Sequence, residues 1–270
     1  MTGATLGGAG AVRRTGTAAF DLTGLTALVT GSSQGIGRAL AEGLAHAGAT
    51  VIVHGRDAAK AARAAQEVAE ASGREAFTAL FDVTDPAAVD AGIAAIEAEH
   101  GVLDILVNNA GIQRRAPITE FTDDDWADLV RTNLSSAFYL SRRVARGMVS
   151  RGSGKIVQIG SVQSQLARPG IAPYSATKGA IVMLTKGLCA DLAPHGVQAN
   201  AIAPGYFATE LTAPLVADEQ FSAWVRGRTP AGRWGDTADL VGALVFLASP
   251  ASDFVNGQTL YVDGGMTAVV

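Results

Sequence analysis

The feature that most constrains this fold is a regular alternation of short apolar runs with longer segments of helical period. The apolar runs lie at residues 25–30, 49–54, 74–82, 102–108, 154–161, 196–204 and 258–263. The segments between them, with apolar residues three or four apart, lie at 35–47, 57–72, 85–100, 122–150, 173–193 and 236–248. Strands that alternate with helices build a parallel sheet, because parallel neighbours need a crossover between them. The sequence therefore predicts an α/β fold: a seven-stranded parallel, doubly wound sheet with helices on both faces.

The domain organisation follows from the continuity of this alternation. No internal repeat and no linker rich in Pro, Gly and Ser divides it, so residues 20–270 are predicted to form a single domain. Residues 1–19 contain no acidic residue and lack the apolar run of a secretion signal, which predicts a flexible tail. The connection at 205–235 is long for a compact domain, and we expect it to be a substrate-binding loop.

Composition excludes several classes of protein. The 21 basic and 25 acidic residues, net charge −4, provide no field that would hold a nucleic acid. A single cysteine, Cys189, permits no intrachain disulfide and fits a reducing cytoplasm, where we expect the protein to be. No stretch approaches the 18 consecutive apolar residues of a membrane span. No metal ligand is predicted, and the expected partner is a small molecule.

A glycine-rich turn joins the first predicted strand to the first predicted helix. It reads T-G-S-S-Q-G-I-G at residues 30–37 and has the spacing G-x-x-x-G-x-G. Glycines there allow a tight turn and a close approach of the backbone, so the N–H groups at the helix N-terminus can bind a pyrophosphate. The predicted contacts are Gly31, Ser32, Ser33, Gln34, Gly35, Ile36 and Gly37.

Candidate catalytic residues cluster in the middle of the chain. Tyr174 and Lys178 are four residues apart on a predicted helix and share one face of it. A nearby ammonium favours the phenolate, which would bring the tyrosine toward acid–base work at neutral pH. Ser161 ends a predicted strand, where ligand crevices form in parallel sheets. Asn133 lies in a helix expected to cross near this site, and a buried amide there needs hydrogen-bond partners.

Together these motifs resemble those of the short-chain dehydrogenase/reductase family over residues 21–265. The resemblance rests on residues 30–37, N-N-A-G at 108–111, Asn133, Ser161, Y-S-A-T-K at 174–178, P-G at 204–205 and V-D-G-G at 262–265. It implies a single-domain Rossmann fold and an NAD(P)-dependent oxidoreductase. It also implies that Tyr174 exchanges the substrate proton and that Ser161 positions the reacting oxygen. Lys178 would then bind the nicotinamide ribose and lower the tyrosine pKa, and Asn133 would hold a water of a proton relay.

The same resemblance implies the cofactor contacts. Beyond the glycine-rich turn, these are Arg56, Asp82, Val83, Asn109, Ala110, Gly111, Tyr174, Lys178, Pro204, Gly205, Phe207 and Thr209. NADP is predicted in preference to NAD, because Gly55 stands where NAD-dependent members commonly carry Asp and Arg56 can meet a 2′-phosphate. Asp57 could weaken this preference but could equally cap the next helix. NAD remains a possible cofactor.

Within the family, four phrases are similar to gluconate 5-dehydrogenases, which interconvert D-gluconate and 5-keto-D-gluconate. They lie at residues 108–115, 202–210, 228–236 and 251–266. The predicted substrate contacts are Ser161, Gln163, Tyr174 and Arg114. Within the enzyme class, reduction of 3-oxoacyl thioesters or oxidation of another polyol or sugar remains open, since Phe207, Phe221 and Trp224 could line an apolar pocket.

Two further expectations complete the sequence-based picture. A nucleotide-sensing scaffold without turnover would use the same fold, but a pure binder has no physical need for the Asn133, Ser161, Tyr174 and Lys178 set. A homotetramer is predicted, because the chain end 258–270 is apolar and the segment 122–150 mixes apolar and polar positions as a partner-facing helix does.

Overall fold

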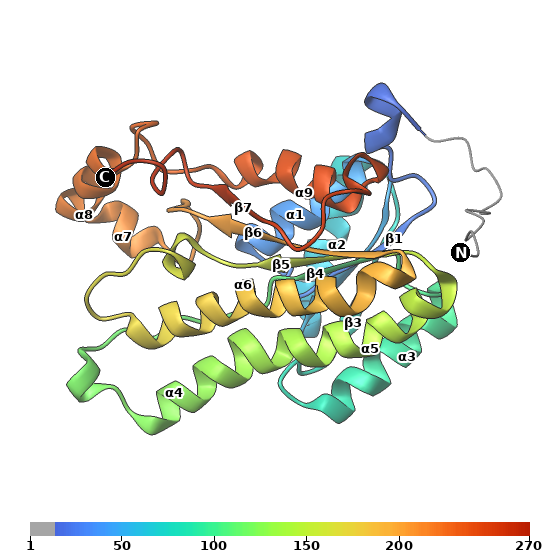
Figure 1. Ribbon diagram of the computed structural model, residues 1–270, viewed down its shortest axis with the longest axis horizontal. Helices are drawn as coiled ribbons and strands as arrows, with labels where there is room; N and C mark the ends of the chain where they lie inside the picture. The colour runs from blue at the N-terminus through green and yellow to red at the C-terminus, as the bar shows by residue number, and fades with distance from the viewer. Residues whose placement is uncertain (1–13) are drawn as a thin grey trace, which may run out of the picture.

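The computed structural model describes residues 14–270, and a parallel seven-stranded sheet forms its centre (Figure 1). The order across the sheet is β3-β2-β1-β4-β5-β6-β7. The strands are β1 (Thr26–Val29), β2 (Thr50–Gly55), β3 (Ala76–Leu80), β4 (Ile105–Asn108), β5 (Gly154–Ile159), β6 (Val197–Pro204) and β7 (Thr259–Val262). The direction of winding reverses between β1 and β4, and a crevice at the carboxyl ends of the strands is expected at such a switch. The predicted fold class is therefore confirmed.

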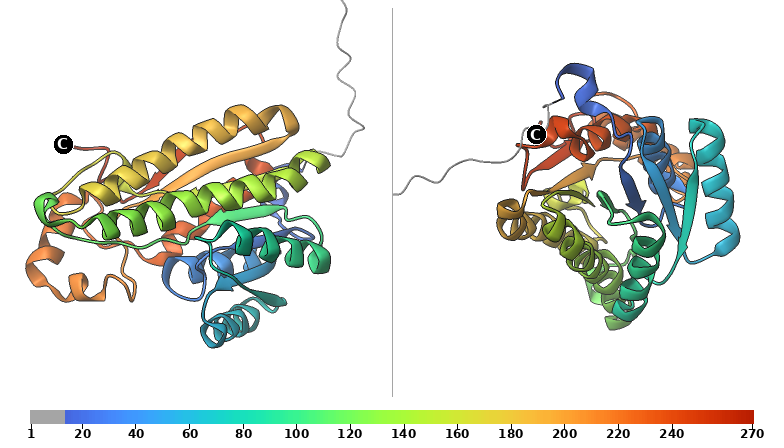
Figure 2. Two further views of the ribbon diagram at one scale, coloured as in Figure 1. Left: turned by 90° about the horizontal axis from the view of Figure 1, so that it is seen from below. Right: turned by 90° about the vertical axis from the view of Figure 1, so that its right-hand side faces the viewer.

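Helices cover both faces of the sheet (Figure 2). The longer ones are α1 (Gly35–His46), α2 (Ala58–Ser72), α3 (Pro86–His100), α4 (Asp123–Val130), α5 (Ser136–Arg151), α6 (Ala172–Leu192), α8 (Glu219–Arg228) and α9 (Val241–Ala248). In β1, Ala27 and Val29 pack with α1, α2 and α9, whereas Leu28 packs with α3, α5 and α6. Because successive strand residues point to opposite faces, one apolar strand supplies both cores.

Two connections differ from the sequence-based expectation. The segment 122–150 is α4 and α5 joined by a π-helical turn, Arg131–Ser135, instead of one regular helix. The connection 205–235 is not a plain loop, because it contains the short helix α7 (Ala213–Ala217) and all of α8. Asp218 caps α8 by accepting from the N–H of Phe221, which explains why a helix begins there.

The start of the domain also differs from the prediction. Residues 1–13 of the expected tail lie outside the described residues, whereas Gly16–Phe20 form a 3-10 helix. Ala19 is buried, and the Phe20 ring lies 6.4 Å from that of Phe246 in α9. Residues 16–19 are thus part of a short helix, and a flexible tail before them stays a prediction.

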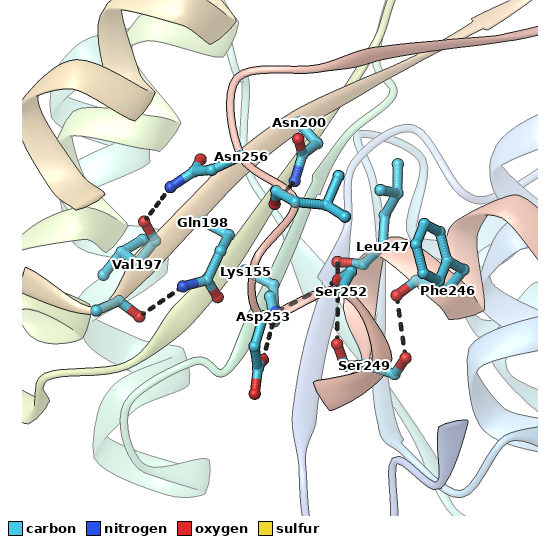
Figure 3. A network of polar contacts seen from close by, with 12 residues as sticks. Lys155, Val197, Gln198, Asn200, Phe246, Leu247, Ser249, Ser252, Asp253 and Asn256 are labelled. Atoms are coloured by element: carbon cyan, nitrogen blue, oxygen red, sulfur yellow. Dashed lines mark hydrogen bonds and ion pairs between the residues drawn. The ribbon is translucent and has the colours of Figure 1, made fainter. Parts of the chain in front are cut away.

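A polar network at the amino ends of β5 and β6 holds the segment that leads into β7 (Figure 3). The buried Lys155 ammonium donates to Asp253 Oδ1 at 2.8 Å and to Ser252 Oγ at 3.3 Å. Asn256 accepts from the N–H of Ala199 and donates to the carbonyl of Val197. These bonds fix the edge strand β7 from the end of the sheet opposite to the crevice.

Helix length and polarity bear on membrane insertion. Across residues 14–270, none of the helices is both long enough and apolar enough to span a lipid bilayer.

Candidate active site

The carboxyl ends of the central strands open into a cavity of about 860 Å³. Every residue predicted to contact the cofactor lines it except Ser32. Ser32 is fully buried. Its hydroxyl donates to the carbonyl of Val29 at 2.6 Å and accepts from the N–H of His54 at 2.9 Å. Its side chain therefore has a structural role, and the predicted contact of Ser32 with the cofactor stays a prediction.

The glycine-rich turn has the geometry that a phosphate group needs. Gly31 and Gly35 have φ angles of +62° and +57°, which L side chains rarely adopt. A Cβ on Gly37 would lie 2.4 Å from both Asn109 Nδ2 and the Gly31 carbonyl oxygen. Within the described chain, the N-cap residue Gln34 makes no side-chain bond to the first turn of α1. The first turn of α1, Gly35 to Gly37, therefore lines the cavity with backbone N–H groups that its own helix does not use, which fits a dinucleotide pyrophosphate.

The N-N-A-G segment holds this turn in place. Asn109 donates its side-chain amide to the carbonyls of Thr30 at 2.9 Å and Gly31 at 3.1 Å. The Thr30 hydroxyl in turn accepts from the N–H groups of Asn109 and Ala110. Gly31 and Ala110 are in close contact, since a Cβ on Gly31 would lie 3.0 Å from Ala110 Cα. The ends of β1 and β4 are thus joined by hydrogen bonds of Thr30 and Asn109.

Asn133 lies in the π-helical turn between α4 and α5 and is buried. Its Oδ1 accepts from the N–H of Ile112 at 2.8 Å, and its Nδ2 donates to the Ile112 carbonyl at 2.9 Å. Asn133 does not itself line the cavity, but Ile112 does. The amide therefore fixes the segment that follows β4, beside the catalytic candidates.

Ser161, Tyr174 and Lys178 come together in the same cavity, as the sequence predicted. The Ser161 hydroxyl accepts from the N–H of Gln163 at 3.1 Å, which leaves its proton available to a substrate oxygen. The Lys178 ammonium donates to the carbonyl of Ile159 at 2.7 Å, and it lies 5.8 Å from the centroid of the Tyr174 ring.

Burial dominates the titration of this pair. It raises the pKa of Tyr174 above its usual value, and a hydrogen bond with Ser161 acts in the opposite direction. Burial also lowers the pKa of Lys178 to about 8, because an ammonium is poorly solvated there. The expectation that Lys178 lowers the Tyr174 pKa is therefore contradicted, because burial outweighs the hydrogen bond with Ser161.

On the adenine side, the cavity is lined by two basic residues, Arg56 and Lys60, and by two acids, Asp57 and Asp82. Arg56 Nη1 lies 3.9 Å from Asp82 Oδ2, and hydrogen bonds from Thr84 lower the pKa of Asp82. Asp57 accepts from the N–H of Lys60 at 3.1 Å and so caps α2. Sequence reasoning did not single out Lys60, which also lines the cavity. The position of Lys60, four residues or about one helical turn after Arg56, could have indicated it.

On the substrate side, the structure separates two neighbouring arginines. Arg114 Nε donates to Asp125 Oδ1 at 3.0 Å, so this predicted substrate contact is held by α4 at the cavity edge. Arg115 Nη2 donates to Gln113 Oε1 at 3.0 Å. Partial burial, together with the charge of Arg168, lowers the pKa of Arg115.

Gln163 and Tyr206 complete this wall. Gln163 is buried, its Nε2 lies 3.5 Å from the Tyr206 hydroxyl, and its Oε1 has no partner within residues 14–270. The Tyr206 ring packs edge-on against Phe221, Trp224 and Trp234 at 5.6–5.9 Å. Sequence reasoning missed Tyr206, although its place directly after Pro204-Gly205 at a strand end was a signal.

Comparison with known proteins identifies the family. The family model described as enoyl-(acyl carrier protein) reductase matches residues 31–267. Gluconate 5-dehydrogenase of Gluconobacter oxydans is 60% identical over 248 residues, which are 92% of this chain and 96% of that protein. The 5-keto-D-gluconate 5-reductase of Escherichia coli is 51% identical over 251 residues, 93% of this chain and 98% of that protein. The chain belongs to the short-chain dehydrogenase/reductase family.

A solved structure agrees with this assignment. The crystal structure of a gluconate 5-dehydrogenase from Burkholderia cenocepacia, in complex with NADP and tartrate, is 57% identical and superposes with a TM-score of 0.91. The match covers 93% of this chain and 98% of that chain. As a short-chain dehydrogenase/reductase, the protein is an NAD(P)-dependent oxidoreductase, which confirms the predicted enzyme class. A scaffold without turnover is therefore not favoured.

Proposed function

We propose that this enzyme interconverts D-gluconate and 5-keto-D-gluconate with NADP. The observation that carries the proposal is the charge of the substrate wall: Arg115 and Arg168 face each other beside the Ser161–Tyr174 pair without an acidic partner in the described chain. Arg168 Nε is buried without a hydrogen-bond partner there. Two neighbouring cations with spare donors favour an anionic substrate, since a carboxylate relieves their repulsion and satisfies their N–H groups.

The remaining groups of this wall suit a polyhydroxylated chain. The free Gln163 Oε1 can accept from a hydroxyl, and Tyr206 can donate to one. A site built from hydrogen-bonding groups discriminates strongly, because an analogue without the hydroxyl leaves those groups unpaired. A sugar acid therefore matches this wall, and the relatives named for gluconate and 5-keto-D-gluconate support the same substrate.

The chain's own residues manage the proton. We assign Tyr174 as the group that takes the hydroxyl proton in oxidation and returns it in reduction, with Ser161 holding the reacting oxygen. Lys178 places a charge near the tyrosine ring, and Asn133 fixes the Ile112 segment beside it. The nicotinamide, when bound, supplies the hydride donor or acceptor.

The cofactor preference follows from the end of β2. Gly55 leaves no carboxylate to repel a 2′-phosphate, and Arg56 and Lys60 line the same part of the cavity. Asp57, the nearest acid after the strand, is used as the helix cap of α2. We therefore assign NADP as the preferred cofactor, with NAD as a weaker one.

The main alternative, reduction of 3-oxoacyl thioesters, needs an extended apolar surface for the acyl chain. In this structure Phe221 and Trp224 pack against Tyr206 and each other, and Arg168 lies over the Phe221 ring at 5.5 Å. The aromatic surface thus supports a charged wall, which favours the sugar acid. Phe207 is also buried and packs into the core.

A substrate panel tests the proposal. Absorbance at 340 nm should show oxidation of D-gluconate and reduction of 5-keto-D-gluconate with NADP(H), with kcat/KM at least about tenfold lower for the corresponding neutral sugar. Efficient reduction of an acetoacetyl thioester, with no action on gluconate or 5-ketogluconate, would overturn the substrate and leave the family unchanged.

Assembly into a homotetramer is also part of the proposal. Exposed apolar side chains occur on two separate faces, Trp126, Phe138 and Met183 on α4, α5 and α6, and Phe254, Leu260 and Val269 around β7. Two unlike self-complementary faces are what a dihedral tetramer requires. Light scattering that showed only a monomer of 27.5 kDa would contradict it. The cytoplasmic location expected from the single cysteine stays a prediction.

A further inference from the structure

The buried imidazole of His54 connects two walls of the cofactor cavity. His54 is the penultimate residue of β2 and is 2% exposed. Its Nδ1 lies 3.2 Å from the backbone N of Gly31 in the glycine-rich turn. Its Nε2 lies 3.0 Å from the carbonyl oxygen of Phe81, directly before Asp82. The ring thus touches the pyrophosphate wall on one side and the adenine wall on the other.

Only one protonation state satisfies both contacts. The Gly31 N–H is a donor, so Nδ1 has to accept, and the Phe81 carbonyl is an acceptor, so Nε2 has to carry the proton. Burial supports this neutral ring, because it lowers the pKa of His54 to about 4. The charged groups that face the ring, Asp82 and Arg56, act on this pKa in opposite directions.

The contact with Gly31 is placed where the cofactor site is most sensitive. Gly31 has a φ of +62° and is in tight contact with Ala110, so its peptide has little freedom to shift. The His54 bond fixes the orientation of that peptide, and the Phe81 bond fixes the start of the segment that carries Asp82 and Val83. The His54 ring also packs on the Phe81 ring, with centroids 4.3 Å apart.

We propose that His54 is a positioning residue for the dinucleotide: its ring sets the spacing and orientation of the glycine-rich turn relative to the connection between β3 and α3. The inference rests on the proposed NADP-dependent function. It concerns binding and not chemistry, since His54 is remote in sequence and in hydrogen bonding from Tyr174 and Lys178. Its loss should therefore weaken cofactor binding and leave turnover at saturating cofactor unchanged.

Three substitutions separate the two bonds. His54→Asn keeps an acceptor for Gly31 and is too short to reach Phe81, whereas His54→Gln can reach Phe81 and loses the acceptor for Gly31. His54→Leu removes both. We expect the NADPH Kd, measured by fluorescence titration, to rise roughly threefold to tenfold in each amide variant and more in His54→Leu, with kcat within about twofold.

The matched control is His100. Its ring packs on Phe77 at 4.4 Å, much as His54 packs on Phe81, but it lies at the end of α3 and does not line the cavity. His100→Leu should leave the NADPH Kd unchanged.

Two results would overturn the inference. One is an unchanged NADPH Kd in both amide variants, even if their thermal stability falls. The other is a parallel loss of kcat and affinity, which would indicate a merely structural role. If His54→Leu does not fold, the amide variants still decide. Wild-type protein that bound no NADPH at all would instead refute the proposed function, and so the two failures are distinguishable.

Discussion

The cofactor side and the substrate side of the one cavity differ in how completely their polar groups are paired. On the cofactor side, the side chains of Thr30, Ser32 and Asn109 donate hydrogen bonds to backbone carbonyls of the turn and the neighbouring strands. On the substrate side, Gln163 Oε1 and Arg168 Nε are buried without partners among the described residues. Buried polar atoms normally have hydrogen-bond partners. The lack of partners on the substrate side therefore points to a ligand that supplies them.

This difference teaches what each side has to achieve. We expect the cofactor side to bind a dinucleotide through main-chain N–H groups at a helix N-terminus, and a turn held by many hydrogen bonds would present those groups without rearrangement. The substrate side has to distinguish one hydroxylated acid from many similar ones. Unpaired groups there make the wrong ligand costly, because it would leave them buried and unsatisfied.

The largest effect is expected from removing the catalytic hydroxyl, a change that leaves the cofactor side and the substrate side of the cavity intact. Tyr174→Phe should lower kcat by at least about a hundredfold, because it removes the hydroxyl that exchanges the substrate proton beside Ser161. NADPH affinity, measured by fluorescence titration, should stay within about twofold. A variant that kept more than a third of the wild-type kcat would remove Tyr174 from its assigned role.

A smaller effect is expected from the substrate side. Arg168→Gln should lower kcat/KM for D-gluconate by about tenfold to a hundredfold, because one charge-assisted contact to the carboxylate is lost. Activity on the neutral sugar should change little. Lys186→Gln, which removes the same charge from an exposed position on α6, is the matched control. An equal loss for acid and neutral sugar would break the comparison between the two sides.

The extent of sequence-based prediction also differs between the sides. Strand and helix periods, the glycine-rich turn and the Tyr174–Lys178 spacing are local signals, so the fold and most of the cofactor wall could be predicted. The structural role of the Ser32 hydroxyl could not be predicted, because whether it faces the cavity or the carbonyl of Val29 depends on the exact path of the turn. The phosphate site formed by the backbone N–H groups stays a prediction.

The substrate wall could be predicted only in part, because long-range packing decides it. Arg114 and Arg115 are chemically equivalent in the sequence, and only the position of Asp125 on α4 separates them. The π-helical turn at Asn133 depends on two bonds to Ile112, which is 21 residues away. Neither has a signal within a short window of sequence.

The cofactor preference gives a moderate effect that sharpens the comparison. Arg56→Ala should raise the KM for NADP by about tenfold and leave that for NAD unchanged, because only NADP carries the 2′-phosphate. Arg63→Ala, an equally exposed arginine on α2 that pairs with Glu67, should change neither.

Gly55→Asp offers the converse change. A Cβ at residue 55 would lie 3.5 Å from Ser33 Cβ, an ordinary van der Waals distance, so the substitution is sterically acceptable. The new carboxylate should repel the 2′-phosphate and shift the ratio of kcat/KM values toward NAD. A wild-type enzyme with a clear NAD preference would contradict the assignment of the cofactor.

The smallest expected effect is on the stability of the ligand-free protein, where the two sides should respond differently. Arg168→Gln should change the free energy of unfolding by less than about 1 kcal/mol, because lost contacts with Phe221 are offset by relief of repulsion with Arg115. Thr30→Val, on the cofactor side, should lower it by about 1–3 kcal/mol, since the N–H groups of Asn109 and Ala110 lose their acceptor. Urea unfolding measures both. Comparable losses in the two variants would show that the substrate wall is as fully paired as the cofactor wall, and an unpaired substrate wall would no longer explain the specificity.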